Sequence, residues 1–288
     1  MHNTSTIAQA LLAAFCAILC GTSALGGGGM ILGAIAGAWA KAGGVYVPTA
    51  RDYNQNGLAL LIDGIENSGF GVHLDYISSL KNLSTRGIMS DVSLSGDYSI
   101  ESNNIRMNHL AVNNRTSNGI GRCNVLSAFS AKTIEVCSSG FVPNWVTDGN
   151  RKNAFFSGPN TFGTLYFNTG NIGSWNSIII GLYTKRVDSG FIGTAAPNFI
   201  REQCQNFRTI SYNSSKSLVI DQEDLSSKVT ISTSSDMYSG EVELFNRSSD
   251  WSRPFNGKIH CMRVYDRNLT AEEMIANQAI DKARFNLT

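Results

Sequence analysis

Apolar and polar positions near the end of the chain predict a buried strand followed by a capped helix. Residues 258–265 are largely apolar on both faces, so we expect this strand to be covered on both sides. Thr270 and Glu273 have capping-box spacing, so the helix is expected to begin after Thr270. The helix then carries an apolar stripe at helical spacing, made of Ile275, Ala279, Ile280 and Ala283.

Shorter apolar or alternating runs predict further strands. Residues 57–64 are expected to form the first strand, and the near-continuous apolar run at 177–183 fits a central strand. Between residues 87 and 120 the alternation is weak. The remaining expected strands are 133–136 with Ile134 and Val136 inward, 164–167, 217–221, 228–232 and 241–245. Short strands joined by many polar turns are typical of all-β sandwiches and jelly rolls.

Two stretches of the sequence resemble laminin-G-like domains of bacterial and phage surface proteins. Residues 57–67 and 71–73 look like the first strand and turn of such domains. The C-terminal stretch carries the family's motif as Gly257-Lys258-Ile259, Arg263, Tyr265, Arg267, Leu269, Thr270 and Glu273. The resemblance implies an all-β fold over residues 57–288, a two-sheet antiparallel jelly-roll sandwich of the concanavalin A-like type with a short C-terminal helix. Such a fold does not by itself give a function.

The first 45 residues form a hydrophobic segment of different character. No charged residue occurs between positions 3 and 40, and Gly29, Gly33 and Gly37 would line one smooth helix face. Three interpretations remain open: a cleaved secretory signal, a retained membrane anchor, and a glycine-zippered helical stalk that packs against copies of itself. Residues 46–56, interrupted by Pro48 and preceded by two glycines, are interpreted as a linker to the domain at 57–288.

Charge and cysteine content narrow the classes of partner and site. The formal net charge is +1, and no run of basic residues exists, which argues against nucleic-acid binding. The six cysteines have no C-x-x-C spacing, so a zinc site is not expected, although one or two disulfides would suit an exported domain. His73 and His260 are interpreted as structural histidines.

Candidate catalytic groups are few. A glycoside hydrolase needs two carboxylates facing one site, and the spacing i, i+2 on a strand could supply them. Two acidic pairs have that spacing, Glu241 with Glu243 and Asp221 with Glu223. We interpret both as solvated outer faces of amphipathic strands, and we expect no enzymatic activity.

Two loops combine an aromatic ring with polar groups, as sugar-binding sites do. We expect ligand-binding residues among Trp145, Asp148 and Asn150 in the first loop, and among Asp250, Trp251 and Arg253 in the second. A buried Trp or a turn would explain each loop equally well. The family resemblance adds calcium as a candidate ligand at a sandwich rim, without a set of ligand residues that can be named.

These observations favour a non-catalytic adhesion or glycan-binding module at a cell envelope, an extracellular site or a virion surface. Its partner would be a glycan or a surface protein, with membrane insertion or self-association through the N-terminal segment. The first alternative is a structural subunit of a virion or surface assembly that packs through Gly29, Gly33 and Gly37. The second is a glycoside hydrolase.

Overall fold

A computed structural model describes nine stretches of the chain: residues 46–108, 119–140, 152–157, 164–168, 179–182, 209–215, 217–227, 237–246 and 255–287. The chain divides into two compact units, Met1–Pro48 and Thr49–Thr288. The architecture below is that of the second unit. Among the described residues, no helix has both the length and the apolar character required to cross a bilayer.

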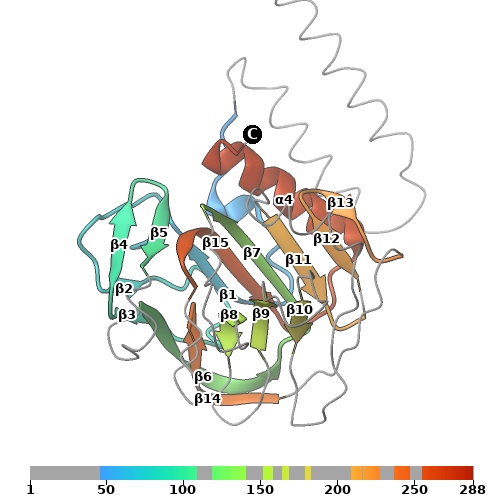
Figure 1. The fold of residues 1–288 in the computed structure, drawn as a ribbon, viewed down its shortest axis with the longest axis horizontal. Helices are drawn as coiled ribbons and strands as arrows, with labels where there is room; N and C mark the ends of the chain where they lie inside the picture. Colours follow the sequence, from blue (N-terminus) through green and yellow to red (C-terminus); the bar gives the residue numbers. More distant parts are fainter. Residues whose placement is uncertain are drawn as a thin grey trace, which may run out of the picture. The chain divides into compact units, whose positions relative to one another are not determined.

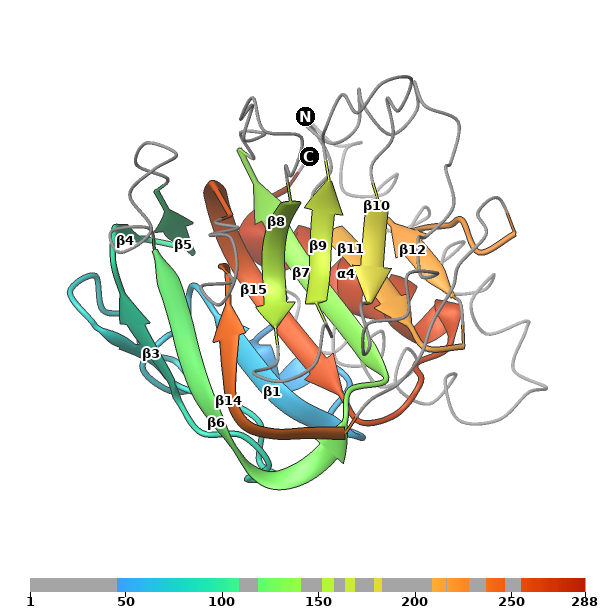
Figure 2. The ribbon, with the colours of Figure 1, turned by 60° about the horizontal axis from the view of Figure 1, so that its bottom comes forward.

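The described strands form two antiparallel sheets (Figures 1 and 2). The eight-stranded sheet has the order β13 (Glu223–Asp224), β12 (Leu218–Ile220), β11 (Thr209–Asn213), β7 (Thr133–Ser139), β15 (Gly257–Tyr265), β5 (Asn104–Met107) and β4 (Tyr98–Glu101), with β1 (Leu58–Asp63) also paired to β15. The seven-stranded sheet has the order β10 (Ile179–Leu182), β9 (Thr164–Asn168), β8 (Lys152–Ser157), β14 (Met237–Leu244), β6 (Ile120–Ser130), β3 (Val92–Ser95) and β2 (Ser79–Leu80).

Strand β15 lies in the interior of the eight-stranded sheet, paired with β7 on one side and with β1 and β5 on the other. Eight of its nine residues are buried. The prediction of a strand covered on both faces is therefore confirmed. The first strand is also confirmed, since β1 occupies six of the eight predicted positions and is buried throughout.

The two sheets share one hydrophobic core, as in a β-sandwich. The eight-stranded sheet contributes Ile134, Val136, Met262 and Val264, and the seven-stranded sheet contributes Val92, Cys123, Val242 and Leu244. On each strand these residues alternate with side chains that point to the opposite, outer face. Ile134 and Val136 point inward as predicted.

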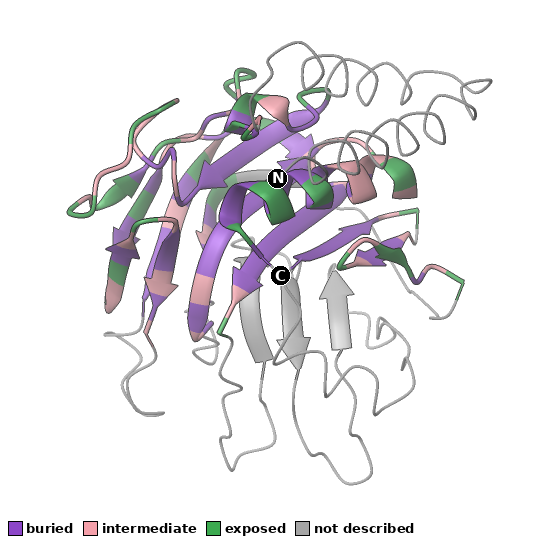
Figure 3. Cartoon of the chain, turned by 90° about the horizontal axis from the view of Figure 1, so that it is seen from above, coloured by how far each residue is buried: buried purple, intermediate pink, exposed green. Residues whose placement is uncertain are grey.

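Helix α4 (Ala271–Phe285) begins as the sequence predicts. The Thr270 hydroxyl accepts a hydrogen bond from the Glu273 backbone, and the Glu273 carboxylate accepts one from the Thr270 backbone. The helix lies across the outer face of the eight-stranded sheet (Figure 3).

The prediction that the apolar stripe forms the buried face of this helix is wrong. Ala279 and Ala283 are exposed and Ile275 is half-buried. The face against the sheet is largely polar, consisting of Met274, Asn277, Gln278, Asp281, Arg284 and Phe285, with Ile280 also buried. These positions follow the same helical period, but polar side chains occupy most of them, because the sheet beneath them is polar as well.

The segment predicted as a linker contributes to the domain from Thr49 onward. Thr49 caps the short 3₁₀ helix η1 (Ala50–Asp52), and Tyr53 and Asn54 are buried. The Tyr53 hydroxyl donates to Asp281 of α4 at 2.7 Å, and the Asn54 backbone donates to Asn277 at 3.1 Å. This stretch is therefore fixed to the C-terminal helix.

Other strand predictions had mixed outcomes. Strands β7, β9, β10, β12 and β14 overlap predicted strands. Among the described strands, β10, predicted as a central strand, is the last in the order of its sheet. Residues 87–120 contain β3, β4 and β5, which weak alternation did not predict. Residues 228–232 lie outside the described residues.

Candidate functional site

The predicted binding residues lie outside the part of the chain that the structure describes. This holds for both loops, with Trp145, Asp148, Asn150, Asp250, Trp251 and Arg253, and for the glycines of the N-terminal segment, Gly29, Gly33 and Gly37. The described residues offer two other concentrations of polar groups, one beneath α4 and one on the outer face of the seven-stranded sheet.

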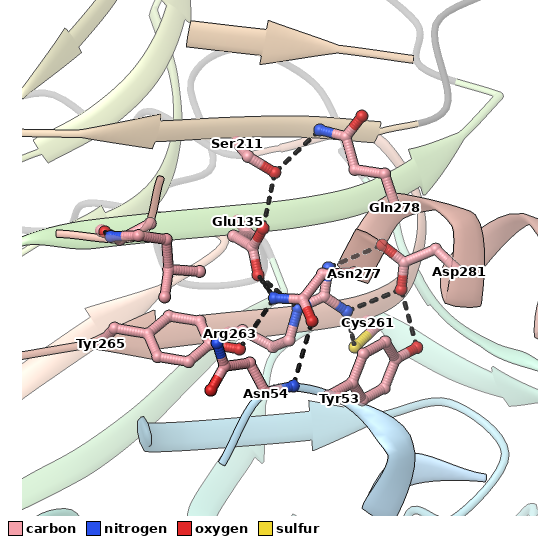
Figure 4. A network of polar contacts seen from close by, with 12 residues as sticks. Tyr53, Asn54, Glu135, Ser211, Cys261, Arg263, Tyr265, Asn277, Gln278 and Asp281 are labelled. Carbon is pink, nitrogen blue, oxygen red and sulfur yellow. Dashed lines mark hydrogen bonds and ion pairs between the residues drawn. The ribbon is translucent and has the colours of Figure 1, made fainter. Parts of the chain in front are cut away.

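Arg263 is the centre of the polar network beneath α4 (Figure 4). Its Nη1 and Nη2 each donate to a carboxylate oxygen of Asp281 at 2.6 Å, and its Nε donates to Glu135 at 2.7 Å. All three side chains are at most 1% exposed. The Arg263 guanidinium also lies 4.2 Å above the centre of the Tyr53 ring. One cation thus serves two carboxylates without access to water.

Neutral side chains satisfy the remaining oxygens of this network. Glu135 also accepts from the Ser211 hydroxyl at 2.8 Å and from the Asn277 amide at 2.7 Å. Gln278 donates to Ser211 at 2.8 Å and to the Val219 carbonyl at 3.0 Å. The network therefore connects α4 with β7, β11, β12 and β15, and each buried group has the partners that burial requires.

Burial and charge change the protonation of these groups. Burial raises the pKa of Glu135, because desolvation and the neighbouring Asp281 outweigh its contact with Arg263. Burial alone would lower the pKa of Arg263, but Asp281 and Glu135 hold it well above its usual range. Arg263 is therefore the fixed positive charge of the network.

A second buried ion pair lies about one turn further along α4, at its C-terminal end. Arg284 donates to Asp63 at 2.8 Å, and the second oxygen of Asp63 accepts from the backbones of Ile65 and Glu66. The side chains of Arg284 and Asp63 are at most 2% exposed. Because neither pair can be reached by a ligand from solvent, we assign both to holding α4 on the sheet.

The two candidate carboxylate pairs have structural contacts. Glu241 and Glu243 both form ion pairs with Arg122 at 3.5 Å. Asp221 adopts a positive φ of 47° in the turn between β12 and β13, and its carboxylate accepts from the Thr209 backbone at 2.8 Å.

The histidines that the structure describes are structural, as predicted. His73 bonds the Glu101 carbonyl at 2.7 Å, and His260 bonds Ser139 at 2.7 Å and the Asn103 carbonyl at 3.0 Å. Within the described stretches, no group of three His, Cys, Asp or Glu side chains is placed to hold a metal ion.

The outer face of the seven-stranded sheet carries half-buried and exposed polar side chains in register. Cross-strand pairs align Ser79 of β2, Ser93 of β3, Arg122 of β6 and Glu243 of β14 in one row. Neighbouring strands are about 4.8 Å apart, so the row presents a hydrogen-bonding group at each such step. We call this set, together with Ser95, Asn124 and Glu241, the open face.

Arg122 organises the middle of the open face. Besides its two ion pairs it donates to the Ser95 hydroxyl at 3.3 Å, and its side chain is 37% exposed. Asn124 and Glu241, paired in the adjacent row, are exposed. Period-two alternation on β6 and β14 would suggest these outward positions, but the sequence gives no indication of which strands are neighbours.

An irregularity in β6 adds an apolar group beside the open face. Phe129 pairs with Tyr238 and Val125 with Gly240, so residues 126–128 of β6 face a single residue of β14. Leu126 in this bulge is 64% exposed, and its backbone is held by the Ile88 carbonyl at 2.8 Å. Bulges of this kind often redirect side chains next to binding sites.

Comparison with solved structures finds weak likenesses to β-rich domains. Domain 4 of AbnA, a GH43 extracellular arabinanase from Geobacillus stearothermophilus in complex with arabinotriose, matches with TM-score 0.43 and 11% identity over 77% of this chain and 98% of that chain. The CBM40 of the Ruminococcus gnavus IT-sialidase matches with TM-score 0.33 and 21% identity over 51% of this chain and 82% of that chain.

A third likeness is to a structure of botulinum neurotoxin type C, a toxin whose cell entry depends on interaction with two ganglioside molecules. Its TM-score is 0.40, with 10% identity over 80% of this chain and 52% of that chain. At these TM-scores the likenesses carry nothing about the ligand of this chain. No protein-family model matches the sequence, and a comparison with curated proteins finds no relative.

Proposed function

We propose that this chain is a non-catalytic glycan-binding module whose binding surface is the open face. The observation that carries the proposal is the row Ser79, Ser93, Arg122 and Glu243, aligned across four strands and continued by Asn124 and Glu241. Hydroxyl, amide, guanidinium and carboxylate groups are the partners that sugar hydroxyls need, and here a rigid sheet fixes their spacing. Leu126 offers an apolar contact for the C–H surface of a sugar.

We further propose that the sandwich is a jelly roll of the concanavalin A-like type. The residues that resemble the laminin-G-like motif have structural contacts in keeping with such kinship. Arg267 forms two hydrogen bonds with the Glu273 carboxylate, at 2.7 and 2.9 Å, and donates to the Asn56 carbonyl at 2.8 Å. The motif thus joins the last strand, the capped helix and the segment before β1.

The absence of catalysis is part of the proposal. Glycoside hydrolysis needs two carboxylates with distinct acid and base or nucleophile roles. Glu241 and Glu243 instead have the same role, since both form ion pairs with Arg122. Such ion pairs are common for acidic residues on the outer face of a sheet. Display at an extracellular, envelope or virion surface fits such a module, with the N-terminal segment as its attachment.

The test is binding of the full-length chain to an array of neutral and acidic oligosaccharides, followed by calorimetry with the strongest binder. Arg122→Ala should weaken that binding about tenfold or more, since charge-assisted hydrogen bonds would be lost. Arg86→Ala is the matched control, because Arg86 has a 38% exposed side chain and its ion-pair partner, Asp266, is not part of the open face. Retention of no oligosaccharide, or equal affinity of the two variants, would overturn the proposal.

A further inference from the structure

The loop between β1 and β2, residues 64–78, is anchored by contacts with several other parts of the domain. Buried Asn67 donates to the Leu74 carbonyl at 2.8 Å and accepts from the Leu74 backbone at 3.0 Å, which closes the loop at its base. His73 bonds the Glu101 carbonyl at 2.7 Å, and the Tyr98 hydroxyl donates to the Ile77 carbonyl at 3.2 Å. The Arg51 guanidinium lies 4.6 Å above the Phe70 ring.

Several of the larger side chains of the loop take part in these contacts. Tyr76, by contrast, is highly exposed. It is 78% exposed, more than any other large hydrophobic residue that the structure describes, and exposed Asp75 precedes it. A tyrosine ring presents a broad apolar face and a polar tip, and loses little conformational entropy when it binds. A fixed loop lowers the entropic cost of binding further.

The position of Tyr76 relates it to the open face. Ser78 accepts a hydrogen bond from the Leu94 backbone of β3 at 2.7 Å, and Ser79 begins the polar row. Tyr76 is three residues before Ser79, so its Cα lies within about 10 Å of that end of the row, from the length of an extended chain. A ligand lying along the row can therefore extend to the loop.

We propose that Tyr76 is an aromatic platform at the edge of the open face, on which a pyranose ring of the bound glycan stacks. Asp75 beside it accepts hydrogen bonds from sugar hydroxyls. This inference rests on the proposed glycan-binding function, and it adds a specificity-determining position that favours sugars with an uninterrupted C–H face. The platform belongs to the loop, whereas the polar contacts belong to the sheet.

The test compares full-length variants against the oligosaccharide array and measures calorimetric affinity for the strongest binder of the unaltered chain. Tyr76→Ala should weaken binding about tenfold or more, whereas Tyr76→Phe, which keeps the ring, should stay within about twofold. Val72→Ala is the matched control, since Val72 is 45% exposed on the same loop and carries no ring. Thermal unfolding of each variant confirms that the domain remains folded.

The outcomes separate this inference from the proposed function. If the unaltered chain retains no oligosaccharide, the glycan-binding proposal fails and the platform fails with it. If the chain binds, and Arg122→Ala weakens binding while Tyr76→Ala does not, only the platform is overturned. A loss with Tyr76→Ala that Tyr76→Phe restores, with Val72→Ala unchanged, supports it.

Discussion

The outer faces of the two sheets use the same residue types in opposite ways. Beneath α4, Arg263 contacts Glu135 and Asp281, and all three side chains are at most 1% exposed. On the open face, Arg122 contacts Glu241 and Glu243, with side chains 16% to 52% exposed. An arginine between two acidic residues is therefore a structural anchor in one place and an accessible surface in the other, and burial decides which.

The energetic difference between the two faces follows from desolvation. A buried charge that loses its partner remains in a medium of low dielectric, whereas an exposed charge returns to water. Variants on the two faces should therefore differ in kind: those beneath α4 change stability, and those on the open face change binding.

The sharpest way to break this comparison is Arg263→Ala. It leaves Glu135 and Asp281 buried without their cation, and we expect a loss of about 3–5 kcal/mol in the free energy of unfolding. Urea unfolding followed by circular dichroism measures this loss. A change below about 1 kcal/mol would mean that the network beneath α4 behaves like a surface pair.

The pH dependence of stability sharpens the comparison next. Burial raises the pKa of Glu135 and of Asp63, so the folded state binds protons more tightly than the unfolded chain. The free energy of unfolding should therefore fall as pH rises from the unfolded value of a Glu carboxyl, about 4.3, through the raised folded value. Urea unfolding between pH 4.5 and 8 measures the slope.

Glu135→Gln removes one of these titrations and should make that slope shallower. Val72→Ala, which removes no titratable group, is its control and should leave the slope unchanged. Equal slopes for all three proteins would show that Glu135 binds its proton no more tightly in the folded state.

A smaller effect is expected from Thr270→Ala, which tests whether α4 depends more on its cap or on its polar face. Loss of the capping hydroxyl should cost about 1 kcal/mol, by the usual value of an N-cap. Thermal or urea unfolding detects it. A loss as large as that of Arg263→Ala would place the main attachment of the helix at its first turn.

The smallest stability effect is expected from Arg122→Ala. Its two ion pairs are long and partly exposed, so the free energy of unfolding should change by about 0–1 kcal/mol. The same urea titration measures it, with Arg86→Ala beside it. A larger loss would show that the open face contributes to folding as the covered face does.

Local signals predicted the fold near β15 well. The capping box at Thr270 and Glu273 depends on neighbouring residues, so sequence alone specifies it. The two apolar faces of β15 likewise indicated an interior strand. The short strands β3, β4 and β5 were missed because each has only four residues, which is too short for a clear periodic pattern.

The buried face of α4 was missed for a different physical reason. A search for apolar periodicity selects Ile275, Ala279 and Ala283, although the helix buries Asn277, Gln278 and Asp281. Those polar residues are satisfied by Glu135, Ser211 and Arg263, which lie on three separate strands. The charged residues Glu135 and Arg263 within largely apolar strands were the available signal, but neither residue identifies its partner.

The open face was beyond sequence reasoning because register across strands creates it. Ser79, Ser93, Arg122 and Glu243 span 165 positions of the chain, and each is an ordinary outward residue of its own strand. Tyr76 gives no local signal either, since its exposure follows from the contacts that hold its loop.

The bond between Tyr53 and Asp281 has a mechanical consequence. It joins residues 228 positions apart, near the first and last elements of the folded unit. A pulling force that enters the unit at Thr49 reaches this bond and the Asn54–Asn277 bond before it reaches β1. Residues 49–54 and helix α4 would therefore bear the force together. The sheets would bear little force until these two hydrogen bonds broke.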